Sequence, residues 1–162
     1  MNTDEIQIIP YEDKFREQIL AVWERSVLAT HSFLNPGDFK SIKEIVHTID
    51  FNTFQVYCLL TEGRVAGFIG VADQKVEMLF LDPRYFGRGL GKKLMDFALV
   101  ELKANKVDVN EQNLKSVRFY KRLGFETYER TDKDDQGKKY PLLRMQLRQQ
   151  KNEISAEVTP SS

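Results

Sequence analysis

The chain has 162 residues, of which 41% are hydrophobic, so it can form one domain with a sizeable core. Its 24 Lys and Arg balance its 24 Asp and Glu, and this zero net charge argues against nucleic acid or an anionic membrane as partner. The single cysteine, Cys58, excludes an internal disulfide and suits a reducing compartment. No apolar stretch is long enough to span a bilayer, and the acidic N-terminal residues do not resemble a secretory signal. We therefore expect a cytoplasmic protein with small-molecule or protein partners.

The N-terminal third of the chain predicts a short strand and two helices. Residues 6–9 form the strand, and Pro10 begins the turn into a helix whose apolar face has helical spacing. That face consists of Phe15, Ile19, Val22, Trp23 and Val27. The second helix is expected to begin at Ser41, because Ser41 and Glu44 have the spacing of a capping box. His31 lies in the linker between the two helices.

The middle of the chain predicts an antiparallel meander followed by a helix. The strands are residues 53–60, 65–72 and 76–81, joined by tight turns at Glu62-Gly63 and Asp73-Gln74. A helix over residues 90–102 then has one apolar face. It follows the last strand of the meander through a glycine-rich turn.

The C-terminal third predicts a strand at residues 107–109, a helix, and a closing hairpin. Asn113 can cap the helix, and Gly124 can supply its left-handed C-terminal residue. Strands at residues 125–129 and 140–147 form the hairpin. Residues 149–162 are polar and have no apolar period, so we expect a single domain over residues 1–148 and a disordered tail.

The glycine-rich turn Gly87-Arg88-Gly89-Leu90-Gly91-Lys92 has the features of a phosphate-binding site. Glycines let the backbone approach a ligand closely, and the start of a helix points N–H groups and a positive dipole end outward. The P-loop pattern fails because Lys93 stands where a Ser or Thr is needed, and the dinucleotide spacing G-x-G-x-x-G is absent. Both nucleotide-binding motifs are therefore disfavoured.

Two patterns in the right order resemble the GNAT N-acetyltransferase superfamily. Residues 81–94 resemble its acetyl-CoA motif, Q/R-x-x-G-x-G/A, with Phe86 in place of the first residue. Downstream, the pattern N-x-x-A/S-x-x-x-Y-x-x-x-G-F is matched at every fixed position by Asn113, Ser116, Tyr120, Gly124 and Phe125. The resemblance predicts an acetyl-CoA-dependent N-acetyltransferase.

The resemblance implies a GNAT fold, a mixed and mostly antiparallel sheet of about six or seven strands with about four helices. Acetyl-CoA would lie in a cleft where two central strands splay apart, and a primary amine would attack it directly in a ternary complex without metal. The chain would be a monomer or a homodimer. The implied cofactor contacts are Leu79, Leu81, Gly87, Arg88, Gly89, Leu90, Gly91, Lys92, Asn113 and Tyr120.

Two side chains are candidates for the proton transfers. An alkylamine has a pKa of about 10.4, so its neutral form costs about 4 kcal/mol at a pH of about 7.4. Glu77 is predicted to share a strand face with Leu79 and Leu81 and to act as the base; otherwise it is a solvated strand residue. Tyr120 would protonate the departing sulfur; otherwise it is a core aromatic.

The acceptor remains open among small amines, amino acids, antibiotics and protein amines. His31 and Tyr140 are candidates for acceptor contacts from their positions alone, and a lone loop histidine is usually a surface residue. The other class of function is a non-catalytic acyl-CoA-binding module. Phe86, in place of the usual Gln or Arg, is the feature that favours it.

Overall fold

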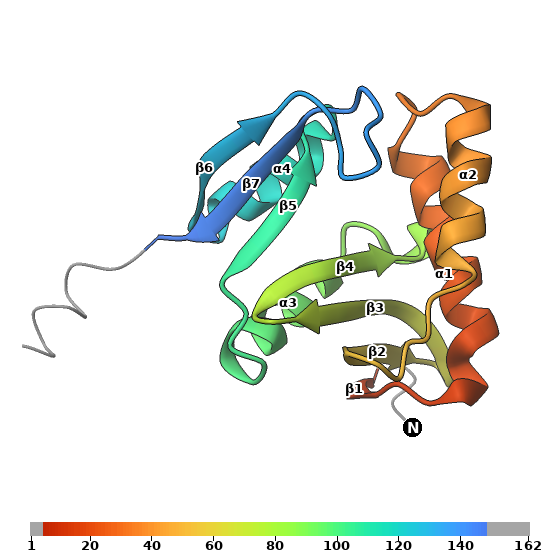
Figure 1. Ribbon diagram of the computed structural model, residues 1–162. Coiled ribbons are helices and arrows are strands. Elements are labelled where there is room, and N and C mark those ends of the chain that lie inside the picture. The colour runs from red at the N-terminus through yellow and green to blue at the C-terminus, as the bar shows by residue number, and fades with distance from the viewer. Residues whose placement is uncertain (1–4, 149–162) are drawn as a thin grey trace, which may run out of the picture. The chain divides into compact units, whose positions relative to one another are not determined.

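The computed structural model describes residues 5–148, which contain seven β-strands and four α-helices (Figure 1). These residues divide into two compact units, the first ending at Asn105 and the second beginning at Lys106. The element content confirms the predicted mixed α and β class. The tail predicted as disordered lies outside the described residues, and the single domain over residues 1–148 stays a prediction.

The first unit is built on four antiparallel strands in the order β1-β2-β3-β4. They are β1 (Ile6–Pro10), β2 (Gln55–Thr61), β3 (Arg64–Ala72) and β4 (Lys75–Leu81). The β3–β4 turn consists of Asp73 and Gln74, both with positive φ, at 50° and 64°. A two-residue turn with φ positive at both positions matches the twist of the flanking strands. The predicted meander is confirmed.

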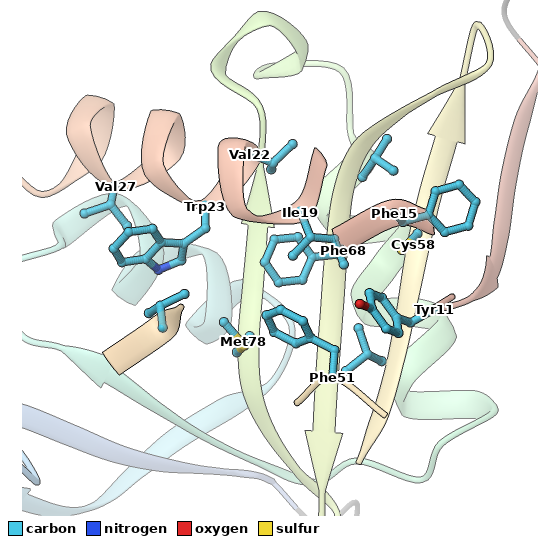
Figure 2. Close-up of a cluster of buried hydrophobic side chains, with 13 residues drawn as sticks. Tyr11, Phe15, Ile19, Val22, Trp23, Val27, Phe51, Cys58, Phe68 and Met78 are labelled. Atoms are coloured by element: carbon cyan, nitrogen blue, oxygen red, sulfur yellow. The ribbon is translucent and has the colours of Figure 1, made fainter. Parts of the chain in front are cut away.

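One face of this sheet is covered by α1 (Arg16–Thr30), which follows a short 3₁₀ turn, η1 (Asp13–Phe15). Ile19, Val22 and Trp23 of α1 are buried in a cluster with Phe68 of β3 and Phe51 (Figure 2). Full burial of such a side chain is worth about 1.5–3 kcal/mol. The apolar face predicted for this helix is therefore its core face.

The opposite face of the sheet is covered by α3 (Leu90–Val100). Tyr57 of β2 lies with its ring centroid 4.7 Å from that of Phe97, whereas its neighbour Cys58 belongs to the cluster under α1. Leu94 and Met95 of α3 are fully buried. The helix ends two residues before the predicted boundary at residue 102.

The second unit is a three-stranded antiparallel sheet in the order β5-β7-β6. Its elements are β5 (Lys106–Asn110), α4 (Leu114–Arg122), β6 (Phe125–Thr131) and β7 (Leu142–Leu147). Gly124 has φ of 100° and ends α4 as predicted. The core of the second unit contains Val107, Phe125 and Met145.

Across residues 5–148, no helix is both long and apolar enough to cross a membrane.

The start of the second helix was predicted wrongly. Helix α2 (Pro36–Val46) begins five residues before Ser41, and Asn35 is its N-cap, accepting a 2.7 Å hydrogen bond from the Asp38 N–H. Pro36 at the first helical position needs no N–H partner, so Asn35-Pro36 is a stronger start signal than the capping box. The Ser41 hydroxyl instead donates to the Gly37 carbonyl inside the helix.

Replacing Asn35 with Ala should destabilise the protein by about 0.5–2 kcal/mol, because the capping acceptor is lost. Ser41→Ala is the matched control, and it should change the free energy of unfolding by less than about 0.5 kcal/mol. Urea denaturation of both variants measures the two effects. A larger loss for Ser41→Ala than for Asn35→Ala would contradict this helix boundary.

Candidate active site

Strand β4 carries the candidate acyl contacts of the first unit. Leu79 and Leu81 are half-buried and are paired with Ile69 and Gly67 of β3. A Cβ added at Gly67 would stand 2.5 Å from the Leu81 Cδ2 and 2.8 Å from the Phe80 carbonyl oxygen. Glycine is therefore required at position 67 for β3 to lie this close to the end of β4.

Glu77 lies at a β-bulge. Val71 pairs with Val76, and its neighbour Gly70 pairs with Met78, so Glu77 is the extra residue on β4. A bulge interrupts the alternation of side chains, and it re-aims the residue that it displaces. Side-chain alternation along β4 therefore does not assign Glu77 to the face of Leu79, and the shared face of these two residues stays a prediction. The Glu77 side chain is exposed.

Residues 82–89, which we call the glycine loop, follow β4, and the first of them is the buried Asp82. Asp82 is 4% exposed and is the N-cap of a 3₁₀ turn, η2 (Pro83–Tyr85), accepting a 3.0 Å hydrogen bond from the Arg84 N–H. Arg25 of α1 donates two hydrogen bonds to the same carboxylate. Burial alone would raise the pKa of Asp82, but these donors outweigh it and hold the pKa below its ordinary value.

The end of the glycine loop has the backbone geometry of an anion site. Gly87 and Gly89 have φ of 79° and 75°, in the left-handed region that favours glycine, and no atom lies within 4 Å of an added Cβ. Without a bound ligand, the positive backbone φ, and not a lack of space for a side chain, is therefore the reason for glycine at both positions. Gly89 is the N-cap of α3 and makes no side-chain hydrogen bond to the first N–H groups of the helix. N–H groups at the start of a helix can bind an anion.

The glycine loop and the first turn of α3 carry several cationic residues. The guanidinium groups of Arg84 and Arg88 lie 5.9 and 5.3 Å from the ring centroid of buried Tyr85. Lys92 is exposed and pairs with Asp96 at 2.9 Å. Phe86 is 42% exposed. The positive charge of the loop therefore stands beside position 86 rather than at it.

The second unit carries the other predicted cofactor residues on α4. Asn113 caps this helix, and its side-chain oxygen accepts a 3.3 Å hydrogen bond from the Ser116 N–H, as predicted. Tyr120 is buried, with its ring edge-on to Phe119 and Phe125 at centroid distances of 5.1 and 5.8 Å. Burial raises the pKa of Tyr120, so its hydroxyl is protonated at neutral pH.

The two candidate acceptor residues lie in different units. His31 ends α1 and is half-buried; its Nδ1 is 2.7 Å from the Thr30 hydroxyl, and burial lowers its pKa. It is therefore neutral at physiological pH. Tyr140 is buried in the second unit, in the connection that leads into β7.

Apart from His31 at the end of α1, the sequence-predicted residues fall into two groups. One strand–loop–helix segment of the first unit carries Glu77, Leu79, Leu81, Gly87, Arg88, Gly89, Leu90, Gly91 and Lys92, while the second unit carries Asn113, Tyr120 and Tyr140. The sequence did not reveal Arg25 as the partner of Asp82. An Asp before Pro is a local turn signal, but no local pattern pairs it with a residue 57 positions away. Within residues 5–148, no cluster of three His, Cys, Asp or Glu could hold a metal ion.

Residues 25–148 match the family model of the acetyltransferase (GNAT) domain. The chain is 36% identical over 129 residues to the peptidyl-lysine N-acetyltransferase YjaB of Salmonella typhimurium, covering 80% of this chain and 89% of YjaB. The solution structure of apo YjaB from Escherichia coli has a TM-score of 0.80 and 34% identity, covering 88% of this chain and 97% of that one. YncA of Salmonella typhimurium, solved with its cofactor acetyl-CoA, has a TM-score of 0.62 at 20% identity and covers 90% and 96% of the two chains.

The chain therefore belongs to the GNAT acetyltransferase family. The family model spans more than half of the chain, and the YjaB relatives align along most of their own length. The predicted GNAT fold and the predicted acetyl-CoA-dependent N-acetyltransferase activity are confirmed. The roles of individual residues stay predictions.

Asp82→Asn should lower the free energy of unfolding at neutral pH by about 1.5–3 kcal/mol, the value of hydrogen bonds to a charged group. A carboxylate with a depressed pKa stabilises the folded state above its unfolded pKa. The difference between variant and parent should therefore shrink as the pH falls below 3.8 and through the folded pKa. Denaturant titrations at several pH values measure it.

Glu126→Gln is the control for this experiment, because Glu126 pairs with Arg148 on the exposed surface at 3.2 Å. Its effect should stay within about 0.5 kcal/mol at every pH. A loss for Asp82→Asn that is the same at pH values well below and well above the carboxyl range would contradict the role of the Asp82 charge.

Phe86→Arg should tighten acetyl-CoA binding, because it adds a cation within the glycine loop at a residue that is 42% exposed. A charge-assisted hydrogen bond is worth about 1.5–3 kcal/mol at best, so we expect a gain of several-fold. Calorimetric titration measures it, with Phe86→Leu as the uncharged control. Equal affinity for the two variants would mean that Arg84 and Arg88 already supply the charge.

Proposed function

We propose that this GNAT enzyme acetylates the ε-amino group of lysine side chains in proteins. The observation that carries the proposal is the 36% identity to YjaB, a peptidyl-lysine N-acetyltransferase, over 89% of the length of YjaB. A family model alone would leave the acceptor open, because fold does not imply substrate. The similarity to YjaB favours a protein amine over an antibiotic or a free amino acid.

The glycine loop and the start of α3 would hold the pyrophosphate of acetyl-CoA. Backbone N–H groups after Gly87 and Gly89 would donate to phosphate oxygens, and Arg88 and Lys92 would supply full charges. This binding needs no side chain at position 86, so it accommodates Phe86. The backbone of residues 79–81 would hold the acetyl carbonyl.

The reaction needs one base and one acid. The neutral amine nitrogen attacks the acetyl carbonyl carbon, a C–N bond forms and the C–S bond breaks. The nitrogen gives up one proton, which Glu77 or a water that it orients would accept. The leaving sulfur takes one proton, which Tyr120 would donate. The exposure of Glu77 at a bulge and the protonated state of buried Tyr120 support these assignments.

Three further expectations belong to this proposal. His31 and Tyr140 would contact the acceptor, and neutral His31 would not repel a cationic lysine. The enzyme would work in the cytoplasm, an expectation supported by its single, free and buried cysteine, Cys58. It would act as a monomer or a homodimer.

Peptide acceptors test the proposal directly. One peptide has a blocked N-terminus and one internal Lys, a second has Arg in place of that Lys, and a third has no Lys but a free N-terminus. Small amines form a fourth arm. We expect thiol release and the mass of one added acetyl group only with the Lys peptide. A higher kcat/KM for the free N-terminus or for a small amine would overturn the assignment to lysine.

The family match disfavours the non-catalytic module to which Phe86 pointed in the sequence. Such a module would bind acetyl-CoA and release no thiol with any of the four acceptor classes. The acceptor experiment therefore also checks this alternative. Thermal unfolding with CoA and with ATP distinguishes CoA binding from nucleotide binding, because only CoA should raise the unfolding temperature of the protein.

Tyr120→Phe should lower kcat at least tenfold while leaving acetyl-CoA affinity nearly unchanged. It deletes only the hydroxyl that would meet the sulfur, and general acid catalysis contributes typically about 10²–10⁴-fold. Steady-state kinetics with the Lys peptide, together with calorimetry, separate the two effects. Phe119→Leu, which changes a neighbouring ring, is the packing control. Full activity of Tyr120→Phe would remove this residue from the mechanism.

Glu77→Gln should act on the other proton transfer. The variant keeps the shape of the side chain and removes the base, so the rising limb of the pH–rate profile should move to higher pH, where more amine is neutral without help. Activity at high pH should therefore recover toward that of the parent. An unchanged profile would make Glu77 a solvated strand residue. Glu126→Gln again serves as the surface control.

A further inference from the structure

Arg25 connects the middle of α1 to the first residue of the glycine loop. Its Nε and Nη2 donate to the same Asp82 oxygen, Oδ2, at 2.9 and 2.5 Å. The Asp82 side chain is only 5% exposed, whereas the Arg25 side chain is 49% exposed. The pair therefore joins a buried carboxylate to a helix on the surface of the first unit.

Asp82 extends this connection to two further elements, β3 and η2. Its N–H donates to the Ala66 carbonyl of β3 at 2.8 Å, and its carbonyl accepts from the Tyr85 N–H at 2.9 Å. Its second carboxylate oxygen, Oδ1, accepts from the Arg84 N–H at 3.0 Å. The orientation of η2 is thus tied through one residue to both β3 and α1.

Tyr85 carries the orientation of η2 to the cations of the glycine loop. Tyr85 belongs to η2 and is buried, so its ring does not reorient independently of this turn. The guanidinium groups of Arg84 and Arg88 both lie over this ring. A rotation of η2 would therefore move both guanidinium groups and the backbone that leads to Gly87.

We propose that Arg25 and Asp82 form a positioning pair that orients the glycine loop for acetyl-CoA. The proposal rests on the proposed function, because acetyl-CoA is the ligand that it assigns to this loop. Arg25 touches neither the acyl group nor the phosphates in this role. It acts through Asp82, η2 and Tyr85 on the groups that do.

Arg84 explains why Arg25 is needed. The Arg84 Nε is 3.9 Å from the Asp82 Oδ1, at the limit of an ion pair. Without Arg25 the buried carboxylate would lack its main partner, and an uncompensated buried charge is strongly unfavourable. Arg84 is the nearest remaining cation and would be drawn toward Asp82, away from an incoming phosphate. Arg25 thus leaves Arg84 available to the ligand.

The test is calorimetric titration of the full chain with acetyl-CoA. Arg25→Gln should weaken acetyl-CoA binding about tenfold, the size of one lost charge-assisted contact. Arg25→Lys keeps the charge but loses the two-pronged donor, so its affinity should be intermediate. In Arg84→Gln, the further effect of Arg25→Gln should be smaller, because Arg84 can no longer be withdrawn. For Arg25→Gln alone, the kcat at saturating acetyl-CoA and the KM of the Lys peptide should stay within about twofold of the parent values.

Lys43→Gln is the matched control. Lys43 pairs with Glu24 at 2.9 Å, so this variant also removes an ion pair made by α1, but not one to the glycine loop. It should bind acetyl-CoA as the parent does. If Arg25→Gln is too unstable to titrate, the more conservative Arg25→Lys decides, and it must still bind more weakly than the parent.

Three results would overturn the proposal. Parent-like acetyl-CoA affinity in folded Arg25→Gln, or in Arg25→Lys where only that variant folds, would make the pair purely structural. If Arg25→Gln raised the KM of the Lys peptide and left the affinity for acetyl-CoA unchanged, the pair would act on acceptor binding and not on the glycine loop. Failure of the parent chain to bind acetyl-CoA would overturn the proposed function and this inference together. Acetyl-CoA binding is measured without acceptor, so a wrong acceptor assignment leaves the titration intact, and the kinetic comparison then uses the acceptor that the peptide experiment identifies.

Discussion

The buried carboxylate of Asp82 is the constraint on which the rest of the site depends. A charge with 4% exposure is tolerated only when it is paired and hydrogen-bonded, and here α1 and η2 supply the donors. Strand β4 can therefore end at one defined residue. The glycine loop begins there with a set direction, and α3 follows from it.

The approach of β3 to β4 is the second part of this constraint. Gly67 removes a side chain that would collide with Leu81, so the end of β4 lies close to its neighbour. The Ala66 carbonyl is then within hydrogen-bond distance of the Asp82 N–H. The same carboxylate residue is thus held from the sheet side and from the helix side. A loop that must present backbone N–H groups to an anion needs this kind of support, because its glycines supply none.

The glycine loop also shows how a family motif tolerates a departure. The first motif position holds an exposed phenylalanine, and the backbone geometry at Gly87 and Gly89 is the feature to which we assign anion binding. Arg84 and Arg88 carry the positive charge of the loop, and their guanidinium groups lie over the Tyr85 ring. We therefore expect the neighbours on the same turn to replace only part of the charge that is missing at position 86. This is a matter of local placement, which a motif written as letters does not contain.

The sequence by itself determined the elements and the family. Apolar periodicity located the core face of α1 and the meander, because side-chain period reports secondary structure directly, and two spaced patterns identified the GNAT family. Its largest error, the start of α2 at Ser41, arose where two local capping signals competed, whereas the predicted strand at 140–147 differs only in beginning at Leu142. Only the tertiary structure decided the bulge at Glu77, the exposure of Phe86 and the pairing of Arg25 with Asp82. The pairing of Arg25 with Asp82 joins residues 57 positions apart, whereas the bulge and the exposure of Phe86 are details of strand pairing and packing. Neither periodicity nor a local motif encodes these contacts.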